Sequence, residues 1–409
     1  MGEIAMFGNV LSEEDKGCAG SDPARLAEMV PINLDANANA PVTQRVTDAV
    51  VAGLVGGTNP SSGHAGGAEA RATITRARDA VASLAEGVFD DAVVFTSGCT
   101  EANNTVLHAA RALRATLITT AVEHPSVLSP SAALQRDGVP VIRMPVGRDG
   151  VIALDVLERH LRSISGAIVL SVQTANSETG VIQPIQEIAR LIAKRGDVLF
   201  HTDAAQSFGK LPLVLGDGGA HAASVSAHKL HGPMGVGGIL LSDGEDRIHP
   251  LLHGGDQEGR RRAGTEALPL IAGMGAACAE RAEQLDGDVG RMRMLRDRLE
   301  ASIVSSVDGA AVNGVGSPRL PNTTSIRFEG RDAMEIVARL DALGILVSQG
   351  SACSSMRPTP SHVLIAMGLT EAQAFSTVRL STSPLNTEDE IDRAIAAVER
   401  VCREVSRAV

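Results

Sequence analysis

From Ile32 onward, short apolar runs alternate with stretches of helical periodicity. The runs that predict buried strands lie at residues 92–96, 116–120, 167–172 and 197–201. A helix is expected after the first run, from about Glu101 to Ala115. Strands that alternate with helices predict an α/β fold with a mostly parallel sheet, covered by helices on both faces. Ligands of such sheets bind beyond the carboxyl ends of the strands, so residues that follow these runs are the first candidates for a site.

The pattern changes at residues 281–302, where charged side chains mark a long amphipathic helix. Beyond it, we expect short strands at 323–328 and 378–381 and a C-terminal helix at 388–405. This part of the chain predicts a second, smaller α+β domain. The expected division is a partly ordered N-terminal extension at 1–31, a large domain at 32–284 whose first residues can pack with the small domain, and a small domain at 285–409.

The composition is that of a globular protein with a sizeable core. The 409 residues suffice for two domains, and 44% of them are hydrophobic and 21% charged. The formal net charge of -11 disfavours nucleic-acid binding, which needs basic patches. The chain has no run of 18 apolar residues, and its first residues lack the basic and apolar segments of a secretory signal. We therefore expect neither a membrane span nor secretion.

Five cysteines are scattered along the chain and form no CxxC pair. An odd, scattered set disfavours a disulfide framework or a zinc site, so we expect no metal and a reducing, cytoplasmic location. Trp and Tyr are both absent. A ring stacked on a bound cofactor would therefore have to come from Phe or His.

One lysine and one acid suggest a pyridoxal phosphate site. Asp203 follows the apolar run at 197–201, and Lys229 lies in a turn of small, hydroxyl and histidine residues. A lysine desolvated among such neighbours has a lowered pKa and can form a Schiff base with an aldehyde. A buried acid needs a cationic partner, which a protonated pyridine nitrogen supplies, although Asp203 could instead cap the next helix. Gln206, close to one helical turn on, could reach the ring hydroxyl.

Two further turns follow apolar runs. The turn at 96–101 joins a strand to a helix N-terminus, where free N–H groups and the helix dipole favour a phosphate. Gly98 allows a close backbone approach and Thr100 can donate a hydroxyl, but an ordinary helix cap is the alternative. His124 follows the run at 116–120, and it is either a structural histidine or the stacking and proton-transfer ring.

The C-terminal part contributes a cysteine and an arginine. Cys353 lies among small residues, with prolines following at 358 and 360, which predicts an exposed, mobile loop and a nucleophile that travels. Arg379 lies inside a strand pattern. An arginine in a half-buried strand favours bidentate binding of a carboxylate, with a surface ion pair as the alternative.

At this point the chain resembles the cysteine desulfurases of the NifS/IscS type, in the class V aminotransferase family of fold-type I pyridoxal phosphate enzymes. The resemblance runs from about Ile32 to Val401. Its motifs lie in order at residues 59–62, 95–101, 123–124, 176–180, 203–207, 226–229, 262–265 and 350–355. It implies a large domain with a mostly parallel, seven-stranded sheet and a smaller α+β domain.

The resemblance also implies a role for each matched residue. Lys229 would be the Schiff-base lysine, Asp203 the partner of the pyridine nitrogen, and His124 the stacking ring that moves protons. The phosphate would be held by Thr100, Ser226 and His228, beside Cys99 as a small filler. Thr265 would reach the phosphate of the neighbouring subunit, which implies a homodimer with shared sites. Arg379 would bind the substrate carboxylate, and Cys353 would form the persulfide.

One departure concerns the pair Asn176 and Ser177, where the family usually has two asparagines near the cofactor and substrate carboxylate. Ser177 is shorter and has no amide, so the alternatives are that Asn176 or a water compensates or that the substrate differs somewhat. The implied reaction converts L-cysteine to L-alanine and leaves a persulfide on Cys353, with His124 as proton acceptor from the thiol. The sulfur would pass to an acceptor such as an iron–sulfur scaffold protein.

Three alternatives remain distinguishable. A selenocysteine lyase or another class V enzyme, such as a transaminase, would not need Cys353. A catalytically silent assembly partner would keep the fold without the cofactor. A nucleotide-binding dehydrogenase is disfavoured, because the glycines at 235–238 precede an expected strand instead of opening a helix.

Overall fold

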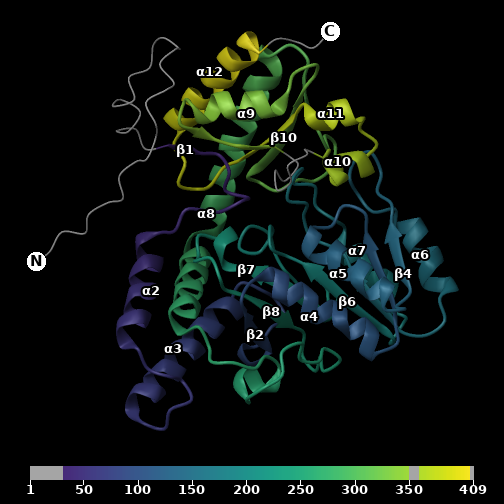
Figure 1. Ribbon diagram of the computed structural model, residues 1–409, viewed down its shortest axis with the longest axis vertical. Coiled ribbons are helices and arrows are strands. Elements are labelled where there is room, and N and C mark those ends of the chain that lie inside the picture. Colours follow the sequence, from purple (N-terminus) through teal and green to yellow (C-terminus); the bar gives the residue numbers. More distant parts are fainter. Residues whose placement is uncertain (1–30, 350–358, 406–409) are drawn as a thin grey trace, which may run out of the picture.

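The computed structural model describes residues 31–349 and 359–405. Its central sheet has seven strands in the order β2-β8-β7-β6-β5-β3-β4 (Figure 1). Their bounds are β2 Val93–Thr96, β3 Thr116–Thr120, β4 Val141–Met144, β5 Ile168–Ser171, β6 Val198–Asp203, β7 Ala222–Ser226 and β8 Gly237–Leu241. Only β8 runs antiparallel to its neighbours in this sheet, so the prediction of a mostly parallel sheet is confirmed.

Helices cover both faces of this sheet. Those before and between its strands are α2 Gln44–Gly56, α3 Ala65–Ala82, α4 Cys99–Ala112, α5 Pro125–Arg136, α6 Leu154–Ser163 and α7 Ile185–Ile192, with short 3-10 turns η1 Asp90–Ala92, η2 Ala227–Lys229 and η3 Gln257–Arg260. Neighbouring strand residues point to opposite faces. Leu117 therefore joins one buried cluster, with α4 and α5, whereas Ile118 joins another, with α3, α6 and α7. Burial on both faces explains why the strands are continuously apolar.

The C-terminal part forms a second sheet and a core of its own. Its four-stranded antiparallel sheet has the order β12-β13-β10-β9. The strands are β9 Ala310–Val312, β10 Thr323–Phe328, β12 Ser348–Gln349 and β13 Thr377–Ser381, and the helices are α9 Ala333–Asp341, α10 His362–Ala366, α11 Glu371–Phe375 and α12 Glu388–Glu404. β1 Ile32–Asn33 pairs in parallel with β11 Ile345–Leu346, so the first described residues lie against this C-terminal core.

The long helix α8 Leu268–Ser306 connects the two cores. Its first turns bury Ile271 and Met274 in the core beneath the central sheet, whereas Leu295 and Leu299 belong to the C-terminal core. The helix begins well before the predicted residues 281–302. The prediction missed its first turns because they are apolar and lack the charged periodicity of the second half. The expected boundary between residues 284 and 285 falls inside α8 and stays a prediction.

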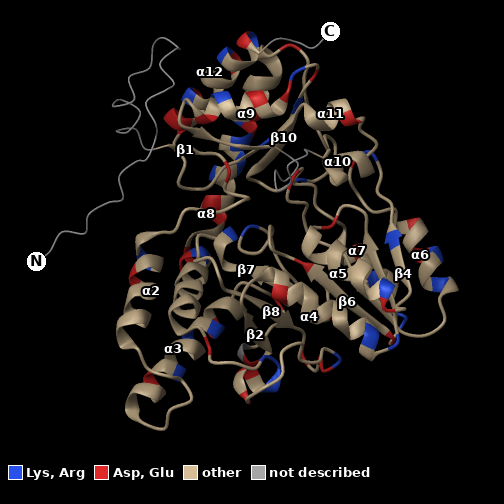
Figure 2. Cartoon of the chain, viewed as in Figure 1, with Lys and Arg blue, Asp and Glu red and all other residues tan. Residues whose placement is uncertain are grey.

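Charged side chains of both signs are interspersed along the outer helices α6, α9 and α12 (Figure 2). On α6, Arg159 pairs with Asp155 at 2.8 Å, one of the surface pairs that individually contribute little. Within residues 31–349 and 359–405, no helix is long and apolar enough to cross a membrane. The same residues contain no group of three or more His, Cys, Asp or Glu side chains placed to hold a metal ion.

Candidate active site

The carboxyl ends of the parallel strands open into a cavity of about 850 Å³. The turn after β2, the segment after β3, the end of β6 and the turn after β7 all reach its wall. Strand β13 adds the opposite side through Arg379. Of the residues that the sequence singled out, those on the wall are Cys99, Thr100, His124, Ser177, Asp203, Gln206, Ser226, His228, Lys229 and Arg379. The fold therefore brings together side chains that are far apart in the sequence.

Lys229 ends the 3-10 turn η2 and presents its amine to the cavity. Its Nζ donates to the carbonyl oxygens of Asn37 at 2.6 Å and Ala38 at 2.9 Å. Burial, followed by the nearby charge of Arg379, lowers the pKa of Lys229 to about 8. An amine with this pKa is partly unprotonated near neutral pH and can act as a nucleophile.

Asp203, the last residue of β6, is buried and bound only by neutral donors among the described residues. Its Oδ1 accepts from the Ala205 N–H at 3.0 Å and the Cys99 thiol at 3.4 Å, and its Oδ2 accepts from Asn103 Nδ2 at 2.7 Å. The bond from Ala205 shows that the local capping role also holds. A buried carboxylate without a cation fits a protonated ring nitrogen as its missing partner.

The turn before α4 is shaped to hold an anion. Gly98 is the N-cap residue of α4 and has φ of 149°. It has no side chain that could accept a hydrogen bond from the first N–H groups of the helix, so it leaves them available to an anion. A Cβ added to Gly98 would have no heavy atom within 4 Å outside its chain neighbours, so the space in front of it is open. Gly237 allows strand β8 to pass behind, because its own added Cβ would lie 2.8 Å from Gly98 Cα.

Two histidines on the cavity wall have pKa values below the ordinary value for histidine, mainly because the cavity desolvates them. Burial, then the charges of Lys229 and Lys210, lowers the pKa of His228 to about 4, so this ring can offer an N–H but no net charge. His124 is the N-cap of α5, and its Nδ1 accepts the N–H of Ser126 at 3.1 Å. Burial also lowers the pKa of His124, against the opposing charge of Asp203.

Arg379 is already engaged with an acid that the sequence analysis did not single out. Its Nη2 lies 2.6 Å from Asp35 Oδ1, and its Nη1 donates to the carbonyl oxygen of Ser177 at 3.1 Å. Nε of Arg379 is buried without a partner in the described part of the chain. The alternative of an ion pair therefore holds, but the pair is largely buried at the cavity wall and leaves the Nε–H donor of the guanidinium without a partner in the described residues.

The amide of Asn176 is used up in shaping its own turn. Its Nδ2 donates to the carbonyl oxygen of Val122 at 3.0 Å, and its Oδ1 accepts the N–H groups of Glu178 and Thr179, each at 2.9 Å. Asn176 is not among the residues that line the cavity, and its compensation for Ser177 stays a prediction, as do a water or a somewhat different substrate. Only Ser177 of the pair faces the cavity.

Three other expected residues differ in their placement. Gln206 lines the cavity, and its Oε1 is buried without a partner in the described residues, while its Nε2 donates to the Asn37 carbonyl at 3.1 Å. Thr265 is exposed and lies away from the cavity wall. Cys353 lies outside the described residues.

Two buried carboxyl groups on the cavity wall were not predicted. Burial raises the pKa of Glu123 to about 8, although the Thr120 hydroxyl donates to its Oε1 at 2.7 Å. Burial likewise raises the pKa of Glu178 to about 7, and Ser361 Oγ donates to its Oε2 at 2.5 Å. The sequence contains both glutamates inside recognised motifs but has no signal for their burial.

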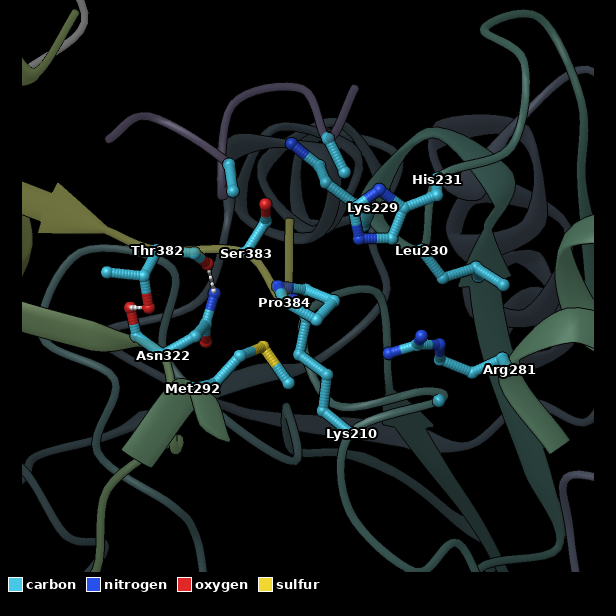
Figure 3. Close-up of a pocket in the computed structure, with 13 residues that line it drawn as sticks. Lys210, Lys229, Leu230, His231, Arg281, Met292, Asn322, Thr382, Ser383 and Pro384 are labelled. Atoms are coloured by element: carbon cyan, nitrogen blue, oxygen red, sulfur yellow. Dashed lines mark hydrogen bonds between the residues drawn. The ribbon is translucent and has the colours of Figure 1, made fainter. Parts of the chain in front are cut away.

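A second, much smaller cavity of about 10 Å³ lies beside Lys229, and Figure 3 shows its walls. Lys210 lies opposite Asn322 and Thr382, and its Nζ donates to the Gln206 carbonyl at 3.1 Å. Burial, then the charge of Lys229, lowers the pKa of Lys210 to about 7. This volume has room for one water molecule and not for a substrate.

Comparison with known proteins identifies the class. The family described as aminotransferase class-V matches residues 32–394, and the chain belongs to this family. It is 40% identical over 384 residues to a cysteine desulfurase of Sinorhizobium fredii, covering 92% of this chain and 98% of the relative. It is 42% identical over 383 residues to the cysteine desulfurase NifS of Azotobacter vinelandii, covering 90% and 92%. A solved NifS-like protein superposes with a TM-score of 0.83 at 33% identity, covering 91% of this chain and 100% of the other.

Proposed function

We propose that this protein is a pyridoxal phosphate-dependent cysteine desulfurase, which converts L-cysteine to L-alanine and collects the sulfur as a persulfide on Cys353. The observation that carries the proposal is the placement of Lys229 and Asp203 on one cavity wall. In a class-V aminotransferase fold, the Lys229 amine can react with the cofactor's aldehyde. The Asp203 carboxylate, which has no bonded cation among the described residues, can pair with the protonated ring nitrogen. The relatives named cysteine desulfurase support the substrate.

The residues present fit the cofactor at separate points. Its phosphate would be held at the N-terminus of α4 by Thr100 with Ser226 and His228, in the open space before Gly98. Its ring hydroxyl would meet Gln206, whose buried Oε1 lacks a partner among the described residues. When bound, the cofactor supplies an aldehyde that joins an amine and a ring that takes up an electron pair.

The chain's own groups then bind the substrate and move protons. Nε of Arg379 is the free donor for the substrate carboxylate, while Asp35 keeps the guanidinium in place. Lys229, with its lowered pKa, holds and returns a proton at Nζ. His124 would stack on the ring, and desolvation lowers the pKa of its imidazole, which favours the neutral form.

The sulfur step needs Cys353 as a thiolate. Its sulfur attacks the substrate sulfur, a sulfur–sulfur bond forms, and the carbon–sulfur bond of cysteine breaks with its electron pair left on carbon. Protonation of that carbon gives alanine, and Cys353 keeps the extra sulfur. No oxidant is consumed, because the substrate carbon is reduced as the sulfur is oxidised.

Mass spectrometry after incubation with cysteine tests this function. We expect one added sulfur on Cys353, and Cys353→Ser should abolish alanine formation while retaining the cofactor. Alanine formation by Cys353→Ser would instead favour a selenocysteine lyase or another class V activity. A colourless wild-type protein that does not take up pyridoxal phosphate would overturn the proposal entirely. The cofactor absorbance should also change in Lys229→Ala, which loses the amine that binds it.

We also propose a homodimer in the cytoplasm that passes sulfur to a scaffold protein. Exposure of Thr265 away from its own cavity supports this arrangement, because the side chain is free to reach a partner's phosphate site.

A further inference from the structure

An unbroken hydrogen-bond chain connects Asp203 to His124 through two buried side chains that the proposed mechanism does not use. Asn103 Nδ2 donates to Asp203 Oδ2 at 2.7 Å and to Ser126 Oγ at 2.9 Å. Ser126 Oγ lies 2.8 Å from His124 Nδ1. Asn103 is 0% exposed and Ser126 is 7% exposed, so water has little access to either link. This hydrogen-bond chain runs from the end of β6 through α4 to the start of α5, and its members Asp203, Ser126 and His124 line the cavity.

The direction of each bond follows from the chemistry of its ends. A carboxylate accepts only, so the Asn103 amide must present its NH₂ group to Asp203. The same NH₂ group carries a second hydrogen toward Ser126 Oγ. The serine oxygen is therefore an acceptor there, and its own hydrogen is free to point at His124 Nδ1.

The backbone gives the same answer for the histidine. The N–H of Ser126 also points at His124 Nδ1, at 3.1 Å. An N–H cannot accept, so Nδ1 must offer its lone pair and the ring proton must sit on Nε2. Two independent donors thus converge on one nitrogen.

We propose that Ser126, oriented by Asn103, is a positioning residue that holds His124 as the Nε2–H tautomer, so that this ring presents a proton donor to the cavity. The inference rests on the proposed function for its catalytic meaning, and it revises the expectation that His124 accepts the proton of the incoming thiol. In the Nε2–H form the exposed nitrogen can give a proton or a hydrogen bond but cannot receive one.

The charged groups around the ring do not by themselves choose a tautomer. Asp203 at the end of β6 favours a charged ring, whereas Lys229 on η2 and His362 on α10 oppose it. The neighbouring Glu123 is buried, and its pKa is raised to about 8, so it is largely uncharged near neutral pH. The choice between the two ring nitrogens is left to the short-range donors on Nδ1.

The test uses the full chain labelled with ¹⁵N-histidine, with the His124 signal assigned by its loss in His124→Gln. In the wild type we expect an unprotonated, hydrogen-bonded Nδ1 and a protonated Nε2. Ser126→Ala keeps the backbone N–H but removes the hydroxyl donor, so the proton affinity of His124 should rise about tenfold, on the order of one hydrogen bond. Ser126→Thr, which restores a hydroxyl, should return the titration toward that of the wild type.

Ser131→Ala is the matched control. Ser131 is also a buried serine on α5, but its Oγ donates to the Val127 carbonyl at 2.6 Å and takes no part in the hydrogen-bond chain from Asp203 to His124. It should leave the His124 signals unchanged. A wild-type His124 that is protonated on Nδ1, or a Ser126→Ala titration equal to that of Ser131→Ala, would overturn the proposal.

The pH profile of alanine formation provides the second measurement. If His124 is a donor, the limb of the profile that reports this ring should move to higher pH in Ser126→Ala by the same tenfold change in proton affinity. A protein that shows the nuclear magnetic resonance shift but forms no alanine would contradict the proposed function while leaving the tautomer assignment intact.

Discussion

At the scale of single residues, the cavity depends on side chains whose partners come from distant parts of the chain. Arg379 is oriented by Asp35 and by the backbone of Ser177, and these contacts leave Nε as the free donor. The planar guanidinium matters here, because a lysine ammonium has neither the fork geometry nor the reach to contact Asp35 and a substrate carboxylate at once. Under the proposed function, substrate binding and local architecture would share this one side chain.

Arg379→Lys tests this division of roles. We expect kcat/KM for cysteine to fall roughly 100-fold, mainly through KM, because charge-assisted bonds to the carboxylate are lost. Steady-state kinetics of the holoenzyme provide the measurement, and the cofactor absorbance should be retained. Arg393→Lys, an exposed change on α12, is the control with no expected effect. Unchanged KM in Arg379→Lys would contradict carboxylate binding by this residue.

Burial of the Lys210 amine lowers the free energy of unfolding by an amount that depends on pH. The unfolded chain keeps this proton up to the ordinary pKa of 10.5, whereas the folded chain keeps it only up to about 7. Between these values the unfolded state binds more protons, so the free energy of unfolding rises with pH. The burial penalty is fully present below pH 7 and is relieved progressively above it.

Lys210→Met should flatten this pH dependence. From pH 7 to pH 9, we expect the wild type to gain on the order of 2 kcal/mol in free energy of unfolding relative to the variant. Urea unfolding of both proteins at the two pH values measures the difference. Parallel pH profiles would mean that Lys210 keeps an ordinary pKa in the folded state.

At the scale of elements, the first half of α8 packs closely against α3. Gly275 faces α3 so tightly that an added Cβ would lie 2.6 Å from Ala77 Cα. Further along the same helix, Gly287 has no heavy atom within 4 Å of the corresponding position. The two glycines share a helix but differ in surroundings, which makes them a matched pair.

Gly275→Ala is expected to destabilise the protein by about 1–3 kcal/mol, because the extra methyl group forces α3 and α8 apart. Gly287→Ala should instead stabilise it by up to about 1 kcal/mol through helix propensity. Denaturant unfolding of both variants measures the sign of each effect. Equal effects at the two positions would show that α3 and α8 are not in close contact.

At the scale of the whole molecule, two cores connected by α8 enclose a cavity whose walls come from both. Arg379 and Ser348 belong to the C-terminal sheet, whereas Lys229 and Asp203 belong to the central sheet. Asn37 lies between them, since its carbonyl oxygen accepts from Lys229 and its amide donates to Thr323 Oγ1 at 2.9 Å. Any relative movement of the two cores would change the cavity.

Thr265→Val tests the shared site of the proposed homodimer. We expect the variant to keep the mass of a dimer in light scattering but to release pyridoxal phosphate about tenfold more readily, because one charge-assisted hydrogen bond to the phosphate is lost. Equilibrium dialysis against the free cofactor measures the change. A monomeric wild-type protein, or cofactor release unaltered in the variant, would contradict the arrangement.

Local patterns determined much of this protein in advance. The run at 116–120 coincides with β3 and the expected strand at 323–328 with β10, because both segments are rich in Thr and other residues that favour strands. The placement of Asp203 at a strand end was equally readable, since residues at strand ends in such sheets meet at one edge, whereas β7, the strand before Lys229, was not predicted. The early start of α8 escaped prediction, because apolar helix turns lack a charged face.

The sequence by itself determined several of the strands, the helices α4 and α12, and the types of side chain at the site, since these depend on short-range periodicity and residue chemistry. Only the tertiary structure decided which groups meet. The partners Asp35 and Arg379 are 344 residues apart, and Asn103 and Asp203 are 100 apart. Burial then set the protonation of Lys210 and Glu123, because the cost of burying a charge depends on the surrounding fold and not on neighbours in sequence.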